Sequence, residues 1–339
     1  MISTNPVCVT GVSGFVGSQT AAELLAAGYR VRGTVRDPER SRTEGLLADA
    51  PGAERLELVA ADLMQPESFI DAVAGCEYVI HTASPYVLEV DDPQRDLVDP
   101  AVNGTTAVLQ ASLAAGVKRV VVTSSLAAVT DQPDGRVLTE ADWNEASTLT
   151  RNPYYYSKTL AERAAHAFVE ANPIEVVVVN PGPVFGPSLV PSLNETNRIL
   201  TGLADGTFPA VLALQYLAVD VRDVAAAHRL AMETPGASGR YLCAAGVRTL
   251  RELRDQMATL GVSKVPRMSL DRGVGIPISK LVARFQPAAI RQYLLTNLGG
   301  EFRIDNSRIR EELGMTFRPI DDTIADTVAD LRRWGHLES

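Results

Sequence analysis

Tyr154 and Lys158 are the two residues whose types and spacing point most directly to chemistry. They lie four positions apart in a segment with helical periodicity, so both side chains fall on one face of the predicted helix. A phenol ordinarily titrates at about pH 10, but a neighbouring ammonium favours the phenolate and brings the pKa of the phenol toward the neutral range. The pair can therefore give a proton to a carbonyl oxygen. Tyr155 and Tyr156 are alternatives for the phenol, although only Tyr154 has a lysine one turn further on.

A serine and an asparagine elsewhere in the chain could assist this pair. Ser125 follows the apolar run 119–123, where its hydroxyl could hold the same carbonyl oxygen and stabilise the charge that develops on it. Ser124 is an alternative that spacing alone does not exclude. Asn103 lies on the preceding helical segment and could order a water that connects Lys158 to solvent.

The segment 7–17, VCVTGVSGFVG, predicts a dinucleotide site. An apolar run is followed by Gly11, Gly14 and Gly17 and then by a helical pattern, which is the strand, turn and helix order of such sites. The three glycines allow a sharp turn, the close approach of a pyrophosphate, and close packing of the helix on the strand. The N-terminus of that helix directs unpaired N–H groups at the phosphates. We expect the same site to include Thr10, Phe15 and Val16.

Basic residues at the end of the second predicted strand (29–35) indicate which dinucleotide binds. An acidic residue there would accept hydrogen bonds from the ribose hydroxyls of NAD. Arg36 stands there instead, with Arg32 nearby, and a guanidinium can clamp a 2′-phosphate. The sequence therefore favours NADP(H), whose nicotinamide would deliver a hydride to the carbonyl that the tyrosine protonates. Arg40 and Arg42 either extend this cluster or are solvated loop residues.

Further contacts are expected where other predicted strands end. Asp62 could accept a hydrogen bond from the adenine amino group, with Leu63 beside it, unless it is an ordinary helix-capping aspartate. Substrate contacts are expected from Ser84, Tyr86, Leu126 and Tyr154. Other cofactor contacts, besides Tyr154 and Lys158, are expected from Thr82, Ala83, Ser84, Thr123 and Gly182.

The order of the predicted elements places these residues at one edge of a parallel sheet. Strands at 7–10, 29–35, 56–60, 78–82, 119–124 and 175–179 alternate with helices at 18–27, 43–50, 66–73, 97–115 and 154–172. This alternation predicts an α/β fold with a right-handed, Rossmann-type doubly wound sheet in a dinucleotide-binding domain, residues 1–187. Residues 188–339 mix helical pieces (192–205, 221–233, 249–260 and 321–334) with short strands such as 240–243. They predict a smaller, mixed α/β substrate lobe, from which 219–245 is expected to return to the first domain; 272–300 gives no clear pattern.

Composition and charge exclude several other classes. The net charge of −9, with no basic stripe, argues against nucleic acid or an anionic membrane as a partner. No apolar run is long enough to span a membrane, and the N-terminus lacks a signal-peptide pattern. The three cysteines, Cys8, Cys76 and Cys243, are expected to be free buried thiols, which suits a reducing cytoplasm. None of the four histidines has a metal-ligand neighbour at the usual spacing, so we expect no metal site. A monomer and a homodimer are both compatible with the sequence.

Several motifs together resemble the extended short-chain dehydrogenases/reductases: TGxxGxxG at 10–17, the Asp62-Leu63 pair, YYYSK at 154–158 and NPGPVFGP at 180–187. More narrowly, VRGTVRDPER (31–40), HTASPY (81–86), VVTSSLAAV (121–129) and YYYSKTLAE (154–162) are similar to the dihydroflavonol 4-reductase-like aldehyde and ketone reductases. The resemblance covers roughly residues 5–240. It is weakest at 126–150 and 188–220, where substrate is gripped, so a flavonoid substrate is not implied.

The resemblance also implies roles for individual residues. Ser125, Tyr154 and Lys158 would form the catalytic triad, with Asn103 as a fourth member. Cofactor contacts would come from Arg36, which would bind the 2′-phosphate, and from Pro181 and Val184, which would pack near the nicotinamide.

Three functions remain to be distinguished. The first is an NADPH-dependent carbonyl reductase acting on an apolar or aromatic small molecule, in a pocket lined by Ser84, Pro85, Tyr86, Leu126, Val190, Leu193 and 210–218. The second is an NAD-dependent nucleotide-sugar epimerase or dehydratase, with a 3β-hydroxysteroid dehydrogenase-like enzyme as a variant. Arg36 argues against it, as does the presence of a single cation, Arg198, between Ser188 and Arg222. The third, a non-enzymatic dinucleotide sensor, is disfavoured because the catalytic triad is retained.

Overall fold

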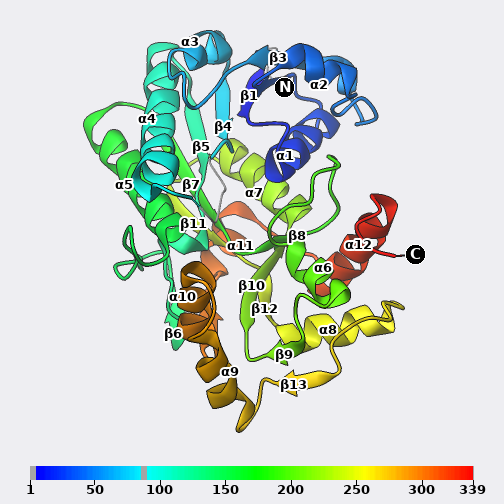
Figure 1. The fold of residues 1–339 in the computed structure, drawn as a ribbon. Coiled ribbons are helices and arrows are strands. Elements are labelled where there is room, and N and C mark those ends of the chain that lie inside the picture. Colours follow the sequence, from blue (N-terminus) through cyan, green and yellow to red (C-terminus); the bar gives the residue numbers. More distant parts are fainter. Residues whose placement is uncertain (1–4, 85–89, 339) are drawn as a thin grey trace.

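A seven-stranded parallel sheet forms the centre of the larger domain (Figure 1). The computed structural model describes residues 5–84 and 90–338, apart from the side chains of Ala288 and Ala289. The strand order is β11-β7-β5-β4-β1-β2-β3. The strands are β1 (Val7–Thr10), β2 (Val31–Val35), β3 (Leu56–Ala60), β4 (Tyr78–His81), β5 (Arg119–Thr123), β7 (Glu175–Pro181) and β11 (Gly239–Cys243). The predicted doubly wound sheet is confirmed.

Helices cover both faces of this sheet. On one face α1 (Phe15–Ala26) packs against α7 (Val221–Glu233), and α11 (Ser307–Leu313) joins their apolar cluster. On the other face α3 (Ser68–Val73), α4 (Asp99–Ala114) and α5 (Pro153–Ala171) share a second cluster. The strands between them are apolar on both faces, as a parallel sheet covered by helices requires.

The chain reverses its direction across the sheet at β1. From β1 it proceeds outward through β2 and β3, then returns to β4 on the other side of β1 and continues through β5 and β7. Such a switch point opens a crevice at the carboxyl ends of the two central strands, and ligands of these folds bind there. Thr10 and His81 are the last residues of those strands.

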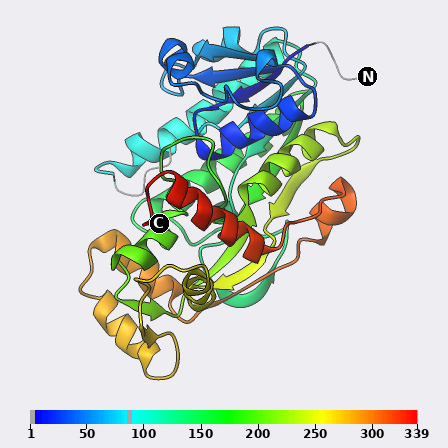
Figure 2. The same cartoon turned by 90° about the vertical axis from the view of Figure 1, so that its right-hand side faces the viewer.

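A second lobe follows β7 and has its own apolar core (Figures 1 and 2). Its strands β8 (Val184–Phe185), β10 (Gln215–Asp220) and β12 (Gly246–Thr249) form one small sheet, and β9 (Ala210–Leu212) pairs with β13 (Met268–Leu270). Its helices are α6 (Arg198–Asp205), α8 (Leu250–Thr259), α9 (Gly275–Ala283), α10 (Ala288–Asn297) and α12 (Ile320–Arg333). The chain returns from β10 to the larger domain through α7 and β11. None of the helices in the described residues is both long and apolar enough to cross a bilayer.

Three local expectations differ from the structure. The helix expected at 43–50 is instead α2 (Pro38–Thr43), because the Asp37 side chain accepts the Arg40 N–H at 3.0 Å and Pro38 suits the first helical turn. Residues 130–152, a polar stretch for which no strand or helix was predicted, contain β6 (Asp134–Leu138), which pairs with β14 (Glu301–Ile304) far along the chain. The region without a clear pattern, 272–300, forms α9 and α10.

Candidate active site

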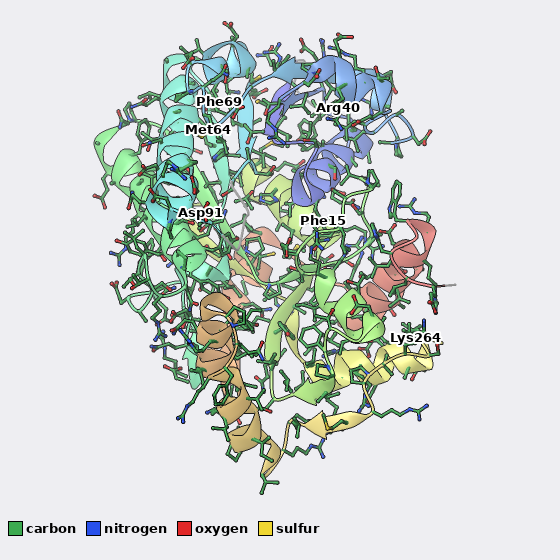
Figure 3. All side chains as sticks on the ribbon, viewed as in Figure 1. Phe15, Arg40, Met64, Phe69, Asp91 and Lys264 are labelled. Carbon is green, nitrogen blue, oxygen red and sulfur yellow. The ribbon has the colours of Figure 1, made fainter. Side chains whose placement is uncertain are left out.

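The glycine turn packs so closely that side chains are excluded from it. A Cβ on Gly17 would lie 2.2 Å from the carbonyl oxygen of Gly11 and 2.7 Å from Oγ1 of Thr82. Gly11 has a φ of +72°, and a Cβ there would lie 3.0 Å from Cα of Ala83. Helix α1 begins after Gly14 with no side-chain cap, so its first N–H groups stay available to an anion. Figure 3 shows Phe15 at this end of α1.

A hydrogen-bonded junction holds the ends of β1 and β4 together. The Thr10 hydroxyl oxygen accepts the N–H groups of Thr82 and Ala83, each at 3.1 Å, and lies 2.8 Å from Nδ1 of His81. Burial lowers the pKa of His81 to about 3, so the ring is neutral. Because the Thr10 oxygen already accepts two N–H groups, its own proton is directed at Nδ1. Thr82 Oγ1 in turn donates to the Thr10 carbonyl at 2.5 Å. The floor of the switch-point crevice is therefore rigid.

Tyr154 and Lys158 lie one turn apart near the start of α5. The Lys158 Nζ is 6.0 Å from the centroid of the Tyr154 ring and donates to Oγ of Ser84 at 2.9 Å. Lys158 is buried, which lowers its pKa to about 8, while the charge of Glu162 acts in the opposite direction. The ammonium is thus oriented beside the phenol, as proton donation requires.

The structure separates the two candidate serines. The Ser124 side chain is buried, and its hydroxyl donates to Oε2 of Glu162 at 2.5 Å. Ser125 is only partly buried, and its Oγ accepts the Ala127 N–H at 3.1 Å, which starts a 3₁₀ turn (Leu126–Ala128) packed against α5. Its hydroxyl donates to no acceptor among the described residues. This difference favours Ser125 as the hydroxyl that holds the carbonyl oxygen.

Asn103, expected to order a water that connects Lys158 to solvent, keeps that role as a prediction. It lies on the exposed side of α4, whereas Thr105, two residues further on, lines a small cavity beside Lys158. Residues two positions apart in a helix are rotated by about 200° around its axis, so the side chains of Asn103 and Thr105 point in nearly opposite directions. The cavity is lined by His81, Ala83, Ser84, Thr105, Val122, Thr123, Ser124, Lys158, Ala161 and Glu162.

Two arginines of the predicted 2′-phosphate site have different environments. Arg36 is exposed just after β2 and pairs with no carboxylate of the described residues. Arg32 was expected to contact the cofactor, but its guanidinium donates instead to Glu57 at 2.9 Å and to the carbonyl oxygen of Ala74 at 2.7 Å. It is the second residue of β2, where Glu57 of neighbouring β3 and carbonyl oxygens at the end of α3 accept from its guanidinium. Arg40 pairs with Glu44, the residue directly after α2, and Arg42 pairs with Glu39 of α2. Figure 3 shows Arg40 on the outer surface.

Asp62 and Leu63 lie between the end of β3 and α4. Asp62 Oδ1 accepts the Met64 N–H at 2.9 Å, while Oδ2 forms no hydrogen bond with the described residues. A Cβ on Gly104 would lie 2.5 Å from Leu63 Cδ2, so α4 packs tightly on this leucine. One carboxylate oxygen therefore remains for a ligand.

The segment after β7 connects the two sheets. A Cβ on Gly182 would lie 1.8 Å from the Leu217 carbonyl oxygen, and Val184 pairs with Val219 of β10. Pro181 ends β7 and thus stands where the two sheets meet. Thr123, which ends β5, bonds His228 of α7 through Oγ1 at 2.7 Å and also lines the cavity beside Lys158.

The predicted substrate contacts are only partly placed near this site. Leu126 is buried in a small core cluster with Val129, Leu138 and Leu217, and its contact with substrate stays a prediction. The segment 210–218 also mostly faces the cores of the lobes. Tyr86, and Pro85 beside it, lie outside the described residues. Ser84 is close to Lys158, as described above.

Sequence reasoning missed two residues that contact this site from below. Glu162 accepts the Ser124 hydroxyl, and Asn180 Nδ2 donates to the Ser125 carbonyl oxygen at 3.2 Å. Glu162 could have been found, because a charged residue one turn beyond Lys158 on a buried helix face needs a partner. Asn180 carries no comparable signal.

Comparisons with known proteins agree with this geometry. A model described as the NAD dependent epimerase/dehydratase family matches residues 7–244. Cinnamoyl-CoA reductase 1 of Arabidopsis thaliana is 37% identical over 336 residues, which cover 98% of this chain and 90% of the relative. Tetraketide alpha-pyrone reductase 1 of the same plant is 37% identical over 343 residues, covering 98% and 97%. The solved structure of yeast methylglyoxal/isovaleraldehyde reductase Gre2, complexed with NADPH, has a TM-score of 0.78 at 27% identity, covering 98% and 100%.

The predicted family is confirmed by these matches, and the relatives are reductases, as the sequence led us to expect. The family model spans the whole parallel sheet, from β1 through β11. The chain belongs to the NAD dependent epimerase/dehydratase family, the extended short-chain dehydrogenases/reductases.

Proposed function

We propose that this chain is an NADPH-dependent carbonyl reductase that converts an aldehyde or ketone to an alcohol. The observation that carries the proposal is the buried Lys158 beside Tyr154 at the switch point, with its ammonium fixed on Ser84. The reductase names of the relatives, one of them complexed with NADPH, support the same chemistry.

The residues present fit NADPH. The uncapped N-terminus of α1 and the closely packed glycine turn suit a pyrophosphate. Arg36 is exposed and unpaired among the described residues, so it is available for a 2′-phosphate. An acidic residue at this position would have favoured NAD and with it the epimerase alternative. We therefore place Thr10, Phe15, Val16, Asp62, Leu63 and Val184 around the cofactor, but leave Arg32 out.

In the reaction, bound NADPH supplies the hydride from its nicotinamide. Ser125 donates a hydrogen bond to the substrate carbonyl oxygen, and Tyr154 transfers its phenolic proton to that oxygen as negative charge develops there. Lys158 stabilises the phenolate that remains, because its ammonium is held one turn away. Solvent then returns the proton to Tyr154.

The substrate that we propose is a small apolar or aromatic carbonyl compound. Tyr155 lies edge-on to Tyr154, with 6.0 Å between the ring centroids. It therefore places a second aromatic ring beside the proton donor. The relatives named for cinnamoyl-CoA, for a tetraketide pyrone and for isovaleraldehyde act on compounds with apolar groups, which supports this class. We further propose that the protein acts in the cytoplasm, as a monomer or homodimer, since its three cysteines are buried and free.

The test compares NADPH and NADH consumption with a panel of aromatic and aliphatic aldehydes, α-diketones and a dihydroflavonol. Turnover is expected with NADPH well above NADH, and Tyr154→Phe is expected to reduce kcat at least 100-fold. Tyr156→Phe is the matched control, because that ring has no lysine one turn further on. No turnover, together with NAD retained by the purified protein, would refute the reductase and favour an epimerase.

A further inference from the structure

Below the catalytic residues lies a buried ion pair that the mechanism above does not use. Glu162 is on α5, one turn beyond Lys158, and its side chain is 0% exposed. Its Oε1 lies 2.7 Å from Nε of Arg240 on β11, which is only 4% exposed. Burying two charges is unfavourable unless they are paired and further hydrogen-bonded. The contacts of each partner therefore indicate what the pair does.

The second carboxylate oxygen of Glu162 is bound to the serine segment. Oε2 accepts the Ser124 hydroxyl at 2.5 Å and Nδ2 of Asn180 at 2.6 Å. The same Asn180 nitrogen donates to the carbonyl oxygen of Ser125 at 3.2 Å. One carboxylate thus fixes the residue before Ser125 directly and Ser125 itself through the asparagine.

The same carboxylate also faces Lys158. Both side chains line the small cavity beside β4 and β5, and the Glu162 charge stabilises the ammonium against burial. The other groups around Lys158 carry no opposing negative charge: His81 of β4 is neutral, Ser84 is a hydroxyl, and Tyr154 is the phenol itself. Glu162 is accordingly the anion that acts on Lys158 in the described part of the chain.

Arg240 limits the charge that Lys158 experiences. Its guanidinium stacks on the Trp143 ring at 4.1 Å from the centroid and donates to the Asp142 carbonyl oxygen at 2.6 Å. These contacts hold it against Glu162, and its positive charge offsets part of the negative charge that the lysine faces. His166, one turn beyond Glu162, lies 3.7 Å from the same carboxylate and also faces it.

We propose that Glu162 is a positioning residue for the reductase: its oxygens hold the Ser124–Ser125 segment in place, and its charge, moderated by Arg240, keeps Lys158 an ammonium at neutral pH. The proposal rests on the proposed function. Glu162 touches neither substrate nor cofactor in this account, and acts only through Lys158 and the serines.

Substitutions of Glu162 and of Arg240 should shift the pH dependence of kcat/KM in opposite directions. Reduction needs the protonated Tyr154–Lys158 pair, so kcat/KM falls at alkaline pH as the pair loses its proton. Glu162→Gln keeps the shape and an acceptor oxygen but removes the anion, so this alkaline limb moves to lower pH. Arg240→Met leaves the Glu162 charge without compensation, so the limb moves to higher pH. A shift of about one pH unit is expected in each direction.

The experiment measures kcat/KM against pH with NADPH for the wild-type chain, Glu162→Gln, Arg240→Met and the double variant. Glu170→Gln, on the exposed part of the same helix, is the matched control and leaves the profile unchanged. If Glu162→Gln fails to fold, the double variant, which leaves no buried charge unpaired, still shows the shift to lower pH.

The outcomes separate the two proposals. A wild-type chain without reductase turnover refutes the proposed function itself. A wild-type chain with an alkaline limb, together with variants whose limbs do not move or move in the same direction, overturns the role of Glu162. If neither limb moves, the pair is only structural, and both variants lower the melting temperature without changing the profile.

Discussion

Replacing Gly17 or Gly14 of the glycine turn by alanine should affect two different properties: the stability of the fold in the first case and the binding of NADPH in the second. At Gly17 the added Cβ would meet the Gly11 carbonyl oxygen at 2.2 Å, more than 1 Å inside an ordinary contact. The clash is with backbone, so no side-chain rotation relieves it, and α1 must move away from β1. At Gly14 the added Cβ would meet, among the described residues, just the same oxygen, at 3.3 Å.

Overpacking of this kind destabilises a protein by about 1–3 kcal/mol, and a backbone clash lies at the upper end. We therefore expect Gly17→Ala to lower the free energy of unfolding by about 3 kcal/mol and the melting temperature by roughly 4 °C. Gly14→Ala should lower the melting temperature by at most about 2 °C, because alanine is only somewhat worse than glycine before a helix. It should still weaken NADPH binding at least 10-fold, because its methyl group occupies the predicted approach of the pyrophosphate.

Urea unfolding measures the stability of both variants, and quenching of protein fluorescence measures their Kd for NADPH. Gly17→Ala with unchanged stability would refute the packing argument. Gly14→Ala with a Kd equal to that of the wild-type chain would show that the pyrophosphate lies elsewhere. The two results are independent, so either argument can fail alone.

Three further predictions concern the cofactor, the buried histidines and the start of α5. Arg36→Glu should raise the Kd for NADPH 10-fold or more while leaving that for NADH nearly unchanged, and Arg40→Glu, whose arginine already pairs within α2, should change neither by a comparable factor. Burial holds the pKa of His81 at about 3 and that of His228 at about 4. Both values lie below the usual pKa of about 6.5, so between pH 6.5 and 4 the unfolded state binds more protons than the folded state. As the pH is lowered through this range, the free energy of unfolding measured in urea should fall by about 1 kcal/mol per pH unit for each histidine. Asn152 has a φ of +50° and precedes α5, so Asn152→Ala should be about 1 kcal/mol less stable than Asn152→Gly in the same unfolding assay.

Local sequence patterns were sufficient to predict most helices and strands of the larger domain. Helix α7 spans 221–233 as expected, because Asp220 accepts the Arg222 N–H at 2.7 Å and caps an amphipathic run. Strand β3 also has the expected bounds, 56–60. Such elements are specified by neighbouring residues, and the glycine turn with its helix belongs to the same class.

Contacts between segments distant in the sequence explain what local patterns could not predict. Strand β6 exists because β14 pairs with it more than 160 residues later, and nothing in 130–152 indicates that partner. Arg32 appears basic and close to the strand end, but Glu57 and the carbonyl oxygens at the end of α3 take up its donors. The direction in which Asn103 points depends on the rotation of α4, which is set by packing, including the close contact of Gly104 with Leu63, and the sequence alone does not give that rotation.

The choice between Ser124 and Ser125 could have been informed by one residue of the sequence, Glu162. The two residues are equivalent by spacing, and only their partners separate them: one hydroxyl donates to Glu162 and the other remains partly exposed. Glu162 itself is visible in YYYSKTLAE as a carboxylate on the same helix face as Lys158. A buried carboxylate requires donors, and the nearest donor that sequence reasoning had already identified was the serine pair at the end of β5. A charged residue one turn from a catalytic lysine is therefore evidence about the neighbouring strand as well as about its own helix.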